Sequence, residues 1–210
     1  VAATMAGEPY YIVMPRITAI ELTGKLQPMV SAKDIILEVL RRIDVKGGRG
    51  RILEYIGEGV QTLSVPERAT ITNMGTETGA TSSIFPSDEE SKKFLTAQGR
   101  EDDWIEIYPD EDANYNEIIH IDLDALEPLI ALPHSPGNVE MVKELEGTPV
   151  DQVCIGSCTN SSLKDLKTVA QILKGNRVHS NTSLTITPGS KQVLTHLAQS
   201  GELQYLLDSG

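Results

Sequence analysis

The sequence predicts an α/β protein in which a mixed α+β module is followed by a partial parallel βαβα module. From residue 150 onward, short apolar strand patterns alternate with amphipathic helix patterns in regular order. Before residue 132 strand and helix patterns also occur, but an acidic stretch over residues 100–116 interrupts them. Between the two parts, residues 132–137 hold two prolines and a glycine, a composition typical of a linker.

The composition describes a globular chain with an acidic surface. With 210 residues, of which 40% are hydrophobic, the chain is long enough for one large or two small apolar cores. The sequence contains no apolar run of about 18 residues and does not open with a signal-peptide pattern, so we expect a cytoplasmic protein, or a mitochondrial matrix protein if the source is eukaryotic. A net charge of -12 argues against nucleic acid as a partner, and no membrane partner is expected.

The first module begins with a strand and a capped helix. Apolar residues alternate over Ile17–Thr23, which predicts a strand, and Tyr10–Met14 could supply its hairpin partner. Ser31 and Asp34 form a capping-box pattern, so a helix is expected to follow as far as Ile43. A further strand is predicted over Ile52–Ile56.

Two more capping boxes and one more strand complete this module. Ser64 and Glu67 enclose a proline and predict a helix over Pro66–Met74. A second box beginning at Ser87 predicts a helix that ends near Gly99. After the acidic stretch, the alternation over Glu117–Leu123 predicts a strand with one buried face, which leaves His120 pointing to solvent or to a satisfied contact.

The predicted domains are residues 1–132, a linker over 133–149 and residues 150–210. A short helix is predicted inside the linker, over Val139–Leu145. The second domain should contain, in order, a strand over 150–155, a helix over 163–173, a strand over 183–187, a helix over 191–199 and a last segment over 202–207. Parallel strands joined in this way bind their ligands beyond their carboxyl ends.

The chain has only two cysteines, Cys154 and Cys158, too few for a disulfide framework. Cys154 lies inside a predicted strand and is expected to be a core thiol. Cys158 lies in the loop Gly156–Ser162, between a strand and a helix whose positive end favours a thiolate. From the residues alone, a metal-ligating thiolate, a nucleophile and a buried cysteine in a helix cap all remain open.

Two sequence blocks resemble the aconitase family of iron-sulfur hydro-lyases, which includes the isopropylmalate dehydratases. Ile155–Ser161 is similar to the family's cluster-binding signature, and Ala69–Thr81 resembles its active-site stretch. Shorter similarities occur at Met5–Gly7, Val45–Gly48 and Thr187–Ser190. The resemblance therefore extends over nearly the whole chain.

This resemblance implies three-layer, aconitase-like modules: residues 1–132 would be a second domain with the tail of the first at its N-terminus, and residues 150–210 the start of a cluster-binding third domain. It implies that Cys158 ligates a 4Fe-4S cluster with one open iron, with Asn160 beside that cofactor. Glu77 would reach the hydroxyl or water on the open iron, and Asn73 would lie near the cluster and orient its surroundings. The two other cysteine ligands of the family lie further downstream, so this fragment alone is expected to hold no stable cluster and to be inactive.

The resemblance also suggests a substrate. Thr81 and the following Ser82–Pro86 look more like an aconitase proper, because isopropylmalate enzymes tend to have an arginine at the position of Thr81. Citrate and isocitrate, interconverted through cis-aconitate in the tricarboxylic acid cycle, are therefore the expected substrates. The alternatives are the large subunit of isopropylmalate dehydratase or homoaconitase, which act on other small carboxylic acids, and a non-enzymatic apo-form that binds RNA or protein. The remaining domains of the parent chain would be its partners.

Overall fold

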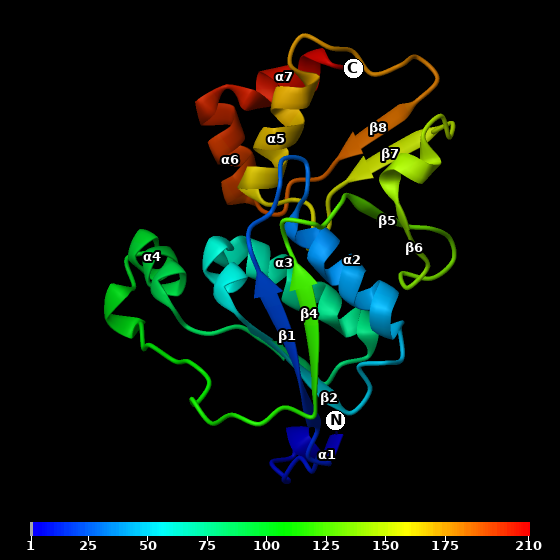
Figure 1. The fold of residues 1–210 in the computed structure, drawn as a ribbon. Coiled ribbons are helices and arrows are strands. Elements are labelled where there is room, and N and C mark those ends of the chain that lie inside the picture. Colours follow the sequence, from blue (N-terminus) through cyan, green and yellow to red (C-terminus); the bar gives the residue numbers. More distant parts are fainter. Residues whose placement is uncertain (1) are drawn as a thin grey trace.

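The computed structural model describes residues 2–210, and these residues form two units, each with its own sheet and apolar cluster (Figure 1). The first unit contains the elements from β1 to β6, and the second contains the elements from β7 to α7. The α/β fold class is confirmed.

A four-stranded parallel sheet forms the centre of the first unit. Its strands are β1 (Arg16–Thr23), β2 (Arg51–Ile56), β3 (Ser82–Ile84) and β4 (Glu117–Asp122), in the order β3-β2-β1-β4. The hairpin partner predicted over Tyr10–Met14 is wrong, because β2 and β4 occupy the two edges of β1 and leave that segment exposed outside any strand. His120 is exposed, as predicted.

The helices before β4 are α1 (Ala2–Met5), α2 (Ala32–Ile43), α3 (Val65–Gly75) and α4 (Glu89–Ala97), with 3-10 turns over Glu58–Thr62, Thr76–Thr78 and Glu101–Asp103. α2 and α3 begin where the capping boxes predict. The box predicted at Ser87 is wrong, because Asp88 is the N-cap of α4 and its side chain accepts from the Glu90 and Ser91 amides. Capping boxes form at Ser31 and Ser64. The apolar face of α2, including Ile35, Ile36 and Leu40, is buried in the main cluster, which fixes the start of this helix relative to the sheet.

A small antiparallel hairpin follows β4 and packs on α2. It consists of β5 (Leu129–Ala131) and β6 (Val139–Met141), and a 3-10 turn follows over Val142–Leu145. The short helix predicted over Val139–Leu145 is therefore correct only as a 3-10 turn in its second half. The Leu129 amide donates to Asp34 Oδ1 at 2.7 Å, which ties the hairpin to the first turn of α2. The boundary between the domains remains a prediction.

The second unit has the predicted βαβα order. Strands β7 (Gln152–Ile155) and β8 (Ser183–Ile186) are parallel, and α5 (Leu163–Leu173), α6 (Lys191–Ser200) and α7 (Glu202–Asp208) pack together beside them. The prediction that Cys154 is a core thiol is wrong, since this side chain is exposed. In this two-stranded sheet Ile155 packs on the helices, and Cys154, one position away, alternates to the uncovered face.

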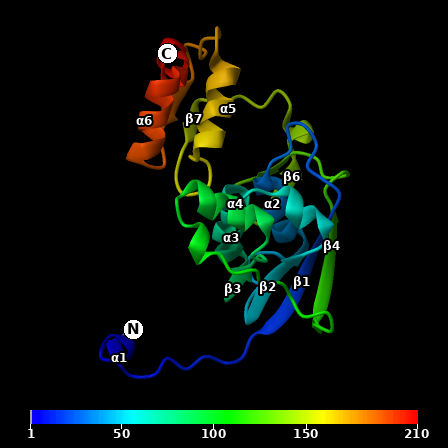
Figure 2. The ribbon, with the colours of Figure 1, turned by 90° about the vertical axis from the view of Figure 1, so that its left-hand side faces the viewer.

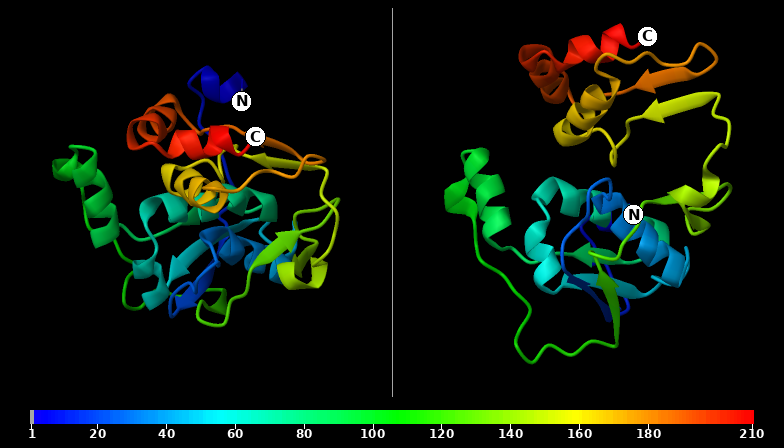
Figure 3. Two further views of the ribbon diagram at one scale, coloured as in Figure 1. Left: turned by 90° about the horizontal axis from the view of Figure 1, so that it is seen from above. Right: turned by 45° about the horizontal axis from the view of Figure 1, so that its top comes forward.

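The two sheets direct their carboxyl ends toward the junction between the units. In Figure 1 the arrowheads of β1 and β4 point to the second unit, and those of β7 and β8 point toward the first. Figure 2 shows α1 at the far end of an extended stretch, away from this junction, and Figure 3 shows the second unit lying over one end of the first. No helix within residues 2–210 is long and apolar enough to span a bilayer.

Candidate functional site

The loop Gly156–Ser162, here called the cysteine loop, leaves the carboxyl end of β7 and leads into α5. Ser157 has φ 67, a left-handed conformation that a non-glycine residue adopts only when its surroundings hold it there. The hydroxyl of the buried Ser161 donates to the Ser157 carbonyl, which closes the loop on itself. Cys158 lies exposed within this closed loop, so its thiol faces solvent at the junction.

Helix α3 of the first unit contacts the cysteine loop directly. Cys158 Sγ donates to Asn73 Oδ1 at 3.4 Å, and Thr70 Oγ1 donates to the Thr159 carbonyl at 3.3 Å. Thr70 and Asn73 are three residues apart, so both lie on the same side of the helix. The structure thus brings together Asn73 and Cys158, two of the predicted site residues that are 85 positions apart in sequence.

Asn160, the predicted cofactor neighbour, contacts the first unit as well. Its Oδ1 accepts a hydrogen bond of 2.9 Å from Lys33 Nζ, at the start of α2. Sequence reasoning identified the capping box around Lys33 but had no signal for this contact, because the partners are separated by 127 positions.

Glu77 lies in the 3-10 turn that continues α3, one turn beyond Asn73. The next residue, Thr78, is fully buried, and its carbonyl accepts from the Gly48 amide at 2.9 Å. A Cβ on Gly48 would lie 2.4 Å from Thr78 Oγ1, so only glycine allows the two segments to approach this closely. Glu77 itself is exposed and has no hydrogen bond or ion pair within residues 2–210, which leaves its carboxylate free for a ligand.

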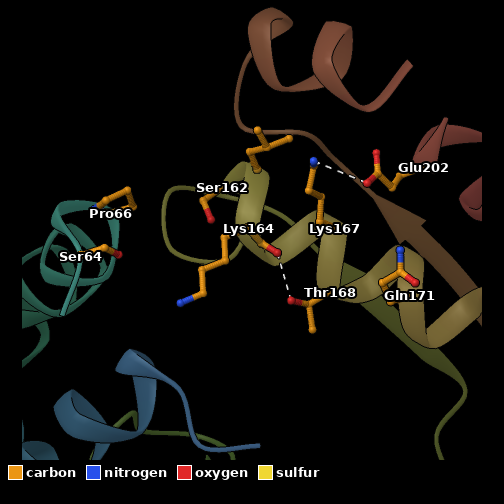
Figure 4. Close-up of a pocket in the computed structure, with 9 residues that line it drawn as sticks. Ser64, Pro66, Ser162, Lys164, Lys167, Thr168, Gln171 and Glu202 are labelled. Atoms are coloured by element: carbon orange, nitrogen blue, oxygen red, sulfur yellow. Dashed lines mark hydrogen bonds and ion pairs between the residues drawn. The ribbon is translucent and has the colours of Figure 1, made fainter. Parts of the chain in front are cut away.

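A cleft between the units adjoins the cysteine loop. Its lining includes residues from both units: Lys33, Glu67, Thr70, Thr159, Asn160 and Lys164. Figure 4 shows a neighbouring pocket, which shares Pro66, Ser162, Lys164 and Thr168 with this cleft. In this view Lys164 projects away from α5, with Ser64 and Pro66 of the first unit nearby. Lys164 Nζ lies 2.5 Å from Glu67 Oε1, and this ion pair joins the units.

The electrostatics of this ion pair follow from its surroundings. Burial by itself would raise the pKa of Glu67, but hydrogen bonds from Lys164 and from the hydroxyl and amide of Ser64 outweigh it and lower the pKa below its ordinary value. Glu67 is therefore ionised at neutral pH and serves both as a capping residue of α3 and as the acceptor for Lys164.

The donor set fits one corner of an iron-sulfur cluster. A solvent-facing thiol at the end of a parallel strand can ligate iron as a thiolate, and the surrounding amide and hydroxyl groups can donate to sulfur. Residues 2–210 contain no group of three His, Cys, Asp or Glu side chains placed to hold a metal ion.

The model of the aconitase family (aconitate hydratase) matches residues 1–210. The chain is 40% identical over 210 residues to a 3-isopropylmalate dehydratase large subunit 2 from Rubrobacter xylanophilus, covering all of this chain and 49% of that protein. It is also 40% identical over 210 residues to a 3-isopropylmalate dehydratase large subunit from Moorella thermoacetica, again with 49% of that protein covered. Against mitochondrial aconitate hydratase of Saccharomyces cerevisiae, the identity is 39% over 225 residues, with 98% of this chain and 29% of that protein covered. The chain spans about half the length of the dehydratase subunits that it matches.

Proposed function

This chain belongs to the aconitase family, and on that premise we propose that the full-length protein is an iron-sulfur hydro-lyase acting on a small hydroxy acid. One observation of the structure carries the proposal. The contact of 3.4 Å between Cys158 and Asn73 places the candidate cluster ligand of one unit against the helix of the other unit that leads to Glu77.

For the substrate, we propose the isopropylmalate type, which the comparisons support better than the citrate and isocitrate first expected. Large subunits of 3-isopropylmalate dehydratase are among the relatives at 40% identity, and about half of their length corresponds to this chain. Citrate and isocitrate remain the second candidate, because Thr81 stands where the isopropylmalate enzymes tend to have an arginine. A separately encoded small subunit would be the partner in the first case, and further domains of the same chain in the second.

A bound 4Fe-4S cluster would supply a Lewis acid that makes the substrate hydroxyl a better leaving group. Cys158 would hold one corner of it as a thiolate. Because a thiolate accepts hydrogen bonds and no longer donates them, the Asn73 amide would turn its Nδ2 toward the sulfur. Glu77, with no partner of its own in the described chain, would give a proton to the hydroxyl oxygen that departs as water, and in the reverse reaction it would take that proton back from the incoming water.

The substrate class can be tested on the full-length protein together with any small subunit encoded beside it. After anaerobic reconstitution, hydration and dehydration rates are measured with 3-isopropylmalate, citrate and isocitrate. We expect turnover with 3-isopropylmalate to exceed turnover with the other two, and Cys158→Ser to abolish all of it. Faster turnover of citrate or isocitrate would select the second candidate, whereas full activity in Cys158→Ser would reject the hydro-lyase proposal altogether.

For residues 1–210 alone, we propose that no stable cluster is held, because one thiolate cannot replace three. Reconstitution with iron and sulfide, followed by desalting with a chelator, measures the iron retained. Stoichiometric iron and sulfide after that step would contradict the proposal.

A cytoplasmic location of the protein is likewise proposed and is tested by fractionating the source cells.

A further inference from the structure

We propose that Lys33 is a positioning residue that sets the orientation of the Asn160 amide and thereby holds the cysteine loop in shape. Lys33 lies at the second position of α2, a helix with eight buried residues. Its backbone is therefore fixed by the core of the first unit. The ammonium reaches across the junction to the second unit.

The chemistry of the two groups determines the orientation. An ammonium has only donors, so Lys33 Nζ can bond to the amide oxygen of Asn160 and not to its nitrogen. The 2.9 Å contact is made to Oδ1, which also accepts a weaker bond of 3.4 Å from Thr159 Oγ1. Nδ2 makes no hydrogen bond within the described residues. Lys33 thus engages the acceptor end of the amide and leaves both N–H donors free.

The side-chain amide of Asn73 has a different hydrogen-bond donor from that of Asn160. Its Oδ1 accepts from the Cys158 thiol at 3.4 Å, and a thiol is a weak donor. The Asn160 Oδ1 accepts from an ammonium at 2.9 Å, a shorter and charge-assisted hydrogen bond. The Asn160 amide is therefore held more firmly in its orientation than the Asn73 amide.

The Lys33 ammonium is also not engaged in an ion pair within the described residues. Lys93, Lys143, Lys164 and Lys167 each form an ion pair with a glutamate, but Lys33 has no carboxylate within 4.0 Å among residues 2–210. Its contact with the loop is thus the one polar side-chain contact it makes in the described chain. Lys164 supports the same junction from the opposite direction, from α5 toward Glu67.

The two cysteines make a direct test possible, because Cys154 is exposed on β7, the strand before the cysteine loop, and serves as an internal reference thiol. Alkylation by iodoacetamide under argon is followed at both sites by mass spectrometry, and the ratio of the two rates is compared among variants of the 210-residue chain. Lys33→Met should raise the Cys158 to Cys154 ratio by about three- to tenfold, the factor expected for losing a partly exposed, charge-assisted hydrogen bond. Lys33→Arg should restore the ratio, and Lys25→Met, which removes an exposed lysine of the same unit, should leave it unchanged.

Action through Asn160 is tested in a double-variant cycle. Asn160→Ala should raise the ratio as Lys33→Met does, and combining the two should add nothing further. The proposal would be overturned if the Cys158 to Cys154 rate ratio in Lys33→Met were within about twofold of the ratio in Lys25→Met, because the loss of a charged hydrogen bond should change the ratio by more than that. Additive effects in the double variant would also overturn it.

One measurement needs no variant and therefore does not depend on how a variant folds. In the unaltered chain, nuclear magnetic relaxation of the Asn160 side-chain amide should show a restricted group, with an order parameter of about 0.8, and a value below about 0.6 would overturn the proposal. The relevance of this orientation to a cluster rests on the proposed function. The alkylation and relaxation measurements test the positioning itself, so the two ideas can fail separately.

Discussion

At the scale of single residues, the candidate site contains a carboxylate without a hydrogen-bond partner in the described chain, in addition to side chains that are hydrogen-bonded. Glu77 is held at the surface by a buried neighbour, Thr78, and by the approach of Gly48, and its carboxylate has no partner in the described chain. A free carboxylate on a fixed turn is suited to exchanging a proton with a ligand. This role belongs to the proposed function.

Glu77→Gln in the full-length protein is therefore expected to lower turnover by about 10²- to 10⁴-fold, the usual effect of removing a general acid-base group. Substrate affinity should change little, because the amide keeps the size of the side chain and can still form hydrogen bonds. Steady-state kinetics with iron content measured in the same sample check this. With full iron occupancy, a loss of turnover below roughly threefold would leave Glu77 without a catalytic role.

Tyr55, in the core of the first unit, also has a polar group without a partner, but this group is buried and not exposed. Its side chain is fully buried and stacks on Phe85 with 4.3 Å between ring centroids, but its hydroxyl has no hydrogen-bond partner in the described chain. Burial raises the pKa of this hydroxyl, so it stays neutral.

Tyr55→Phe should leave the free energy of unfolding unchanged or raise it by about 1 kcal/mol, because it removes an unsatisfied polar group and keeps the ring. Urea unfolding measures this effect, with Tyr10→Phe as the control at an exposed tyrosine. A loss of more than about 1 kcal/mol would mean that the hydroxyl has a partner in solution.

At the scale of elements, α3 connects the interior of the first unit to the cysteine loop. Near its start, the buried Arg68 forms two hydrogen bonds with Asp88, at 2.8 and 2.6 Å, and also donates to the carbonyls of Leu63 and Val60. Asp88 is in turn the N-cap of α4. One buried ion pair therefore fixes the positions of two helices.

Arg68→Met is expected to destabilise the chain by about 3 to 5 kcal/mol, because it leaves the buried Asp88 carboxylate without its counter-charge. Arg68→Met combined with Asp88→Asn should be less destabilised than Arg68→Met alone. Urea unfolding of both variants at neutral pH measures the difference. A single variant that is as stable as the unaltered chain would contradict the structural importance of this pair.

The same ion pair predicts a pH effect. Burial alone would raise the pKa of Asp88, but the Arg68 guanidinium outweighs this and holds the pKa below its ordinary value of 3.8. A depressed pKa means that the stabilisation is fully present above the ordinary pKa and is lost as the pH falls through the lowered one. In Arg68→Met the pKa of Asp88 should rise above its value in the unfolded chain, so lowering the pH should recover part of the lost free energy of unfolding, whereas the unaltered chain loses stability as the pH falls.

Sequence patterns predicted most helices and strands, because the interactions that define these elements are between residues close together in the sequence. The capping boxes at Ser31 and Ser64, and the alternation in β1 and β4, depend on neighbouring residues and were recognised correctly. β3, β5 and β6 were missed, since each has only three residues and owes its strand to a partner distant in sequence or across a turn.

The site was predictable only in part. The identities of Cys158, Asn160, Asn73 and Glu77 came from similarity to a family, and the structure adds that Asn73 and Cys158 are in contact. Lys33 and Lys164 were not predicted, because their partners lie on the other unit. Cys154 was misplaced for a different reason: alternation defines two faces of a strand, but not which of them a helix will cover.

At the scale of the whole molecule, the two units are joined by few polar contacts, among them the Lys164–Glu67 pair at 2.5 Å. Since the Glu67 pKa is lowered, this pair should persist above the ordinary carboxyl pKa of 4.5 and be lost as the pH falls through the lowered value. The Lys164 side chain is largely exposed, so the contribution should be modest, below about 1 kcal/mol.

Lys164→Met should therefore loosen the junction at neutral pH without unfolding either unit. Small-angle X-ray scattering should show a larger radius of gyration, while circular dichroism stays unchanged. Lys167→Met is the matched control, because Lys167 lies on the same helix but pairs with Glu202 inside the second unit. Equal expansion in both lysine variants would show that the Lys164–Glu67 contact does not join the units.

The small sheet of the second unit has a consequence for the colloidal behaviour of the chain. Within residues 2–210, β7 and β8 pair only with each other, so each presents an outer row of unpaired backbone groups that can bond to another molecule. A net charge of -12 keeps molecules apart in dilute buffer, but salt screens this repulsion over about 10 Å at 0.1 M. We therefore expect particles seen by light scattering to grow with added salt, even under reducing conditions, and to grow also as the pH approaches the isoelectric point near 4.7.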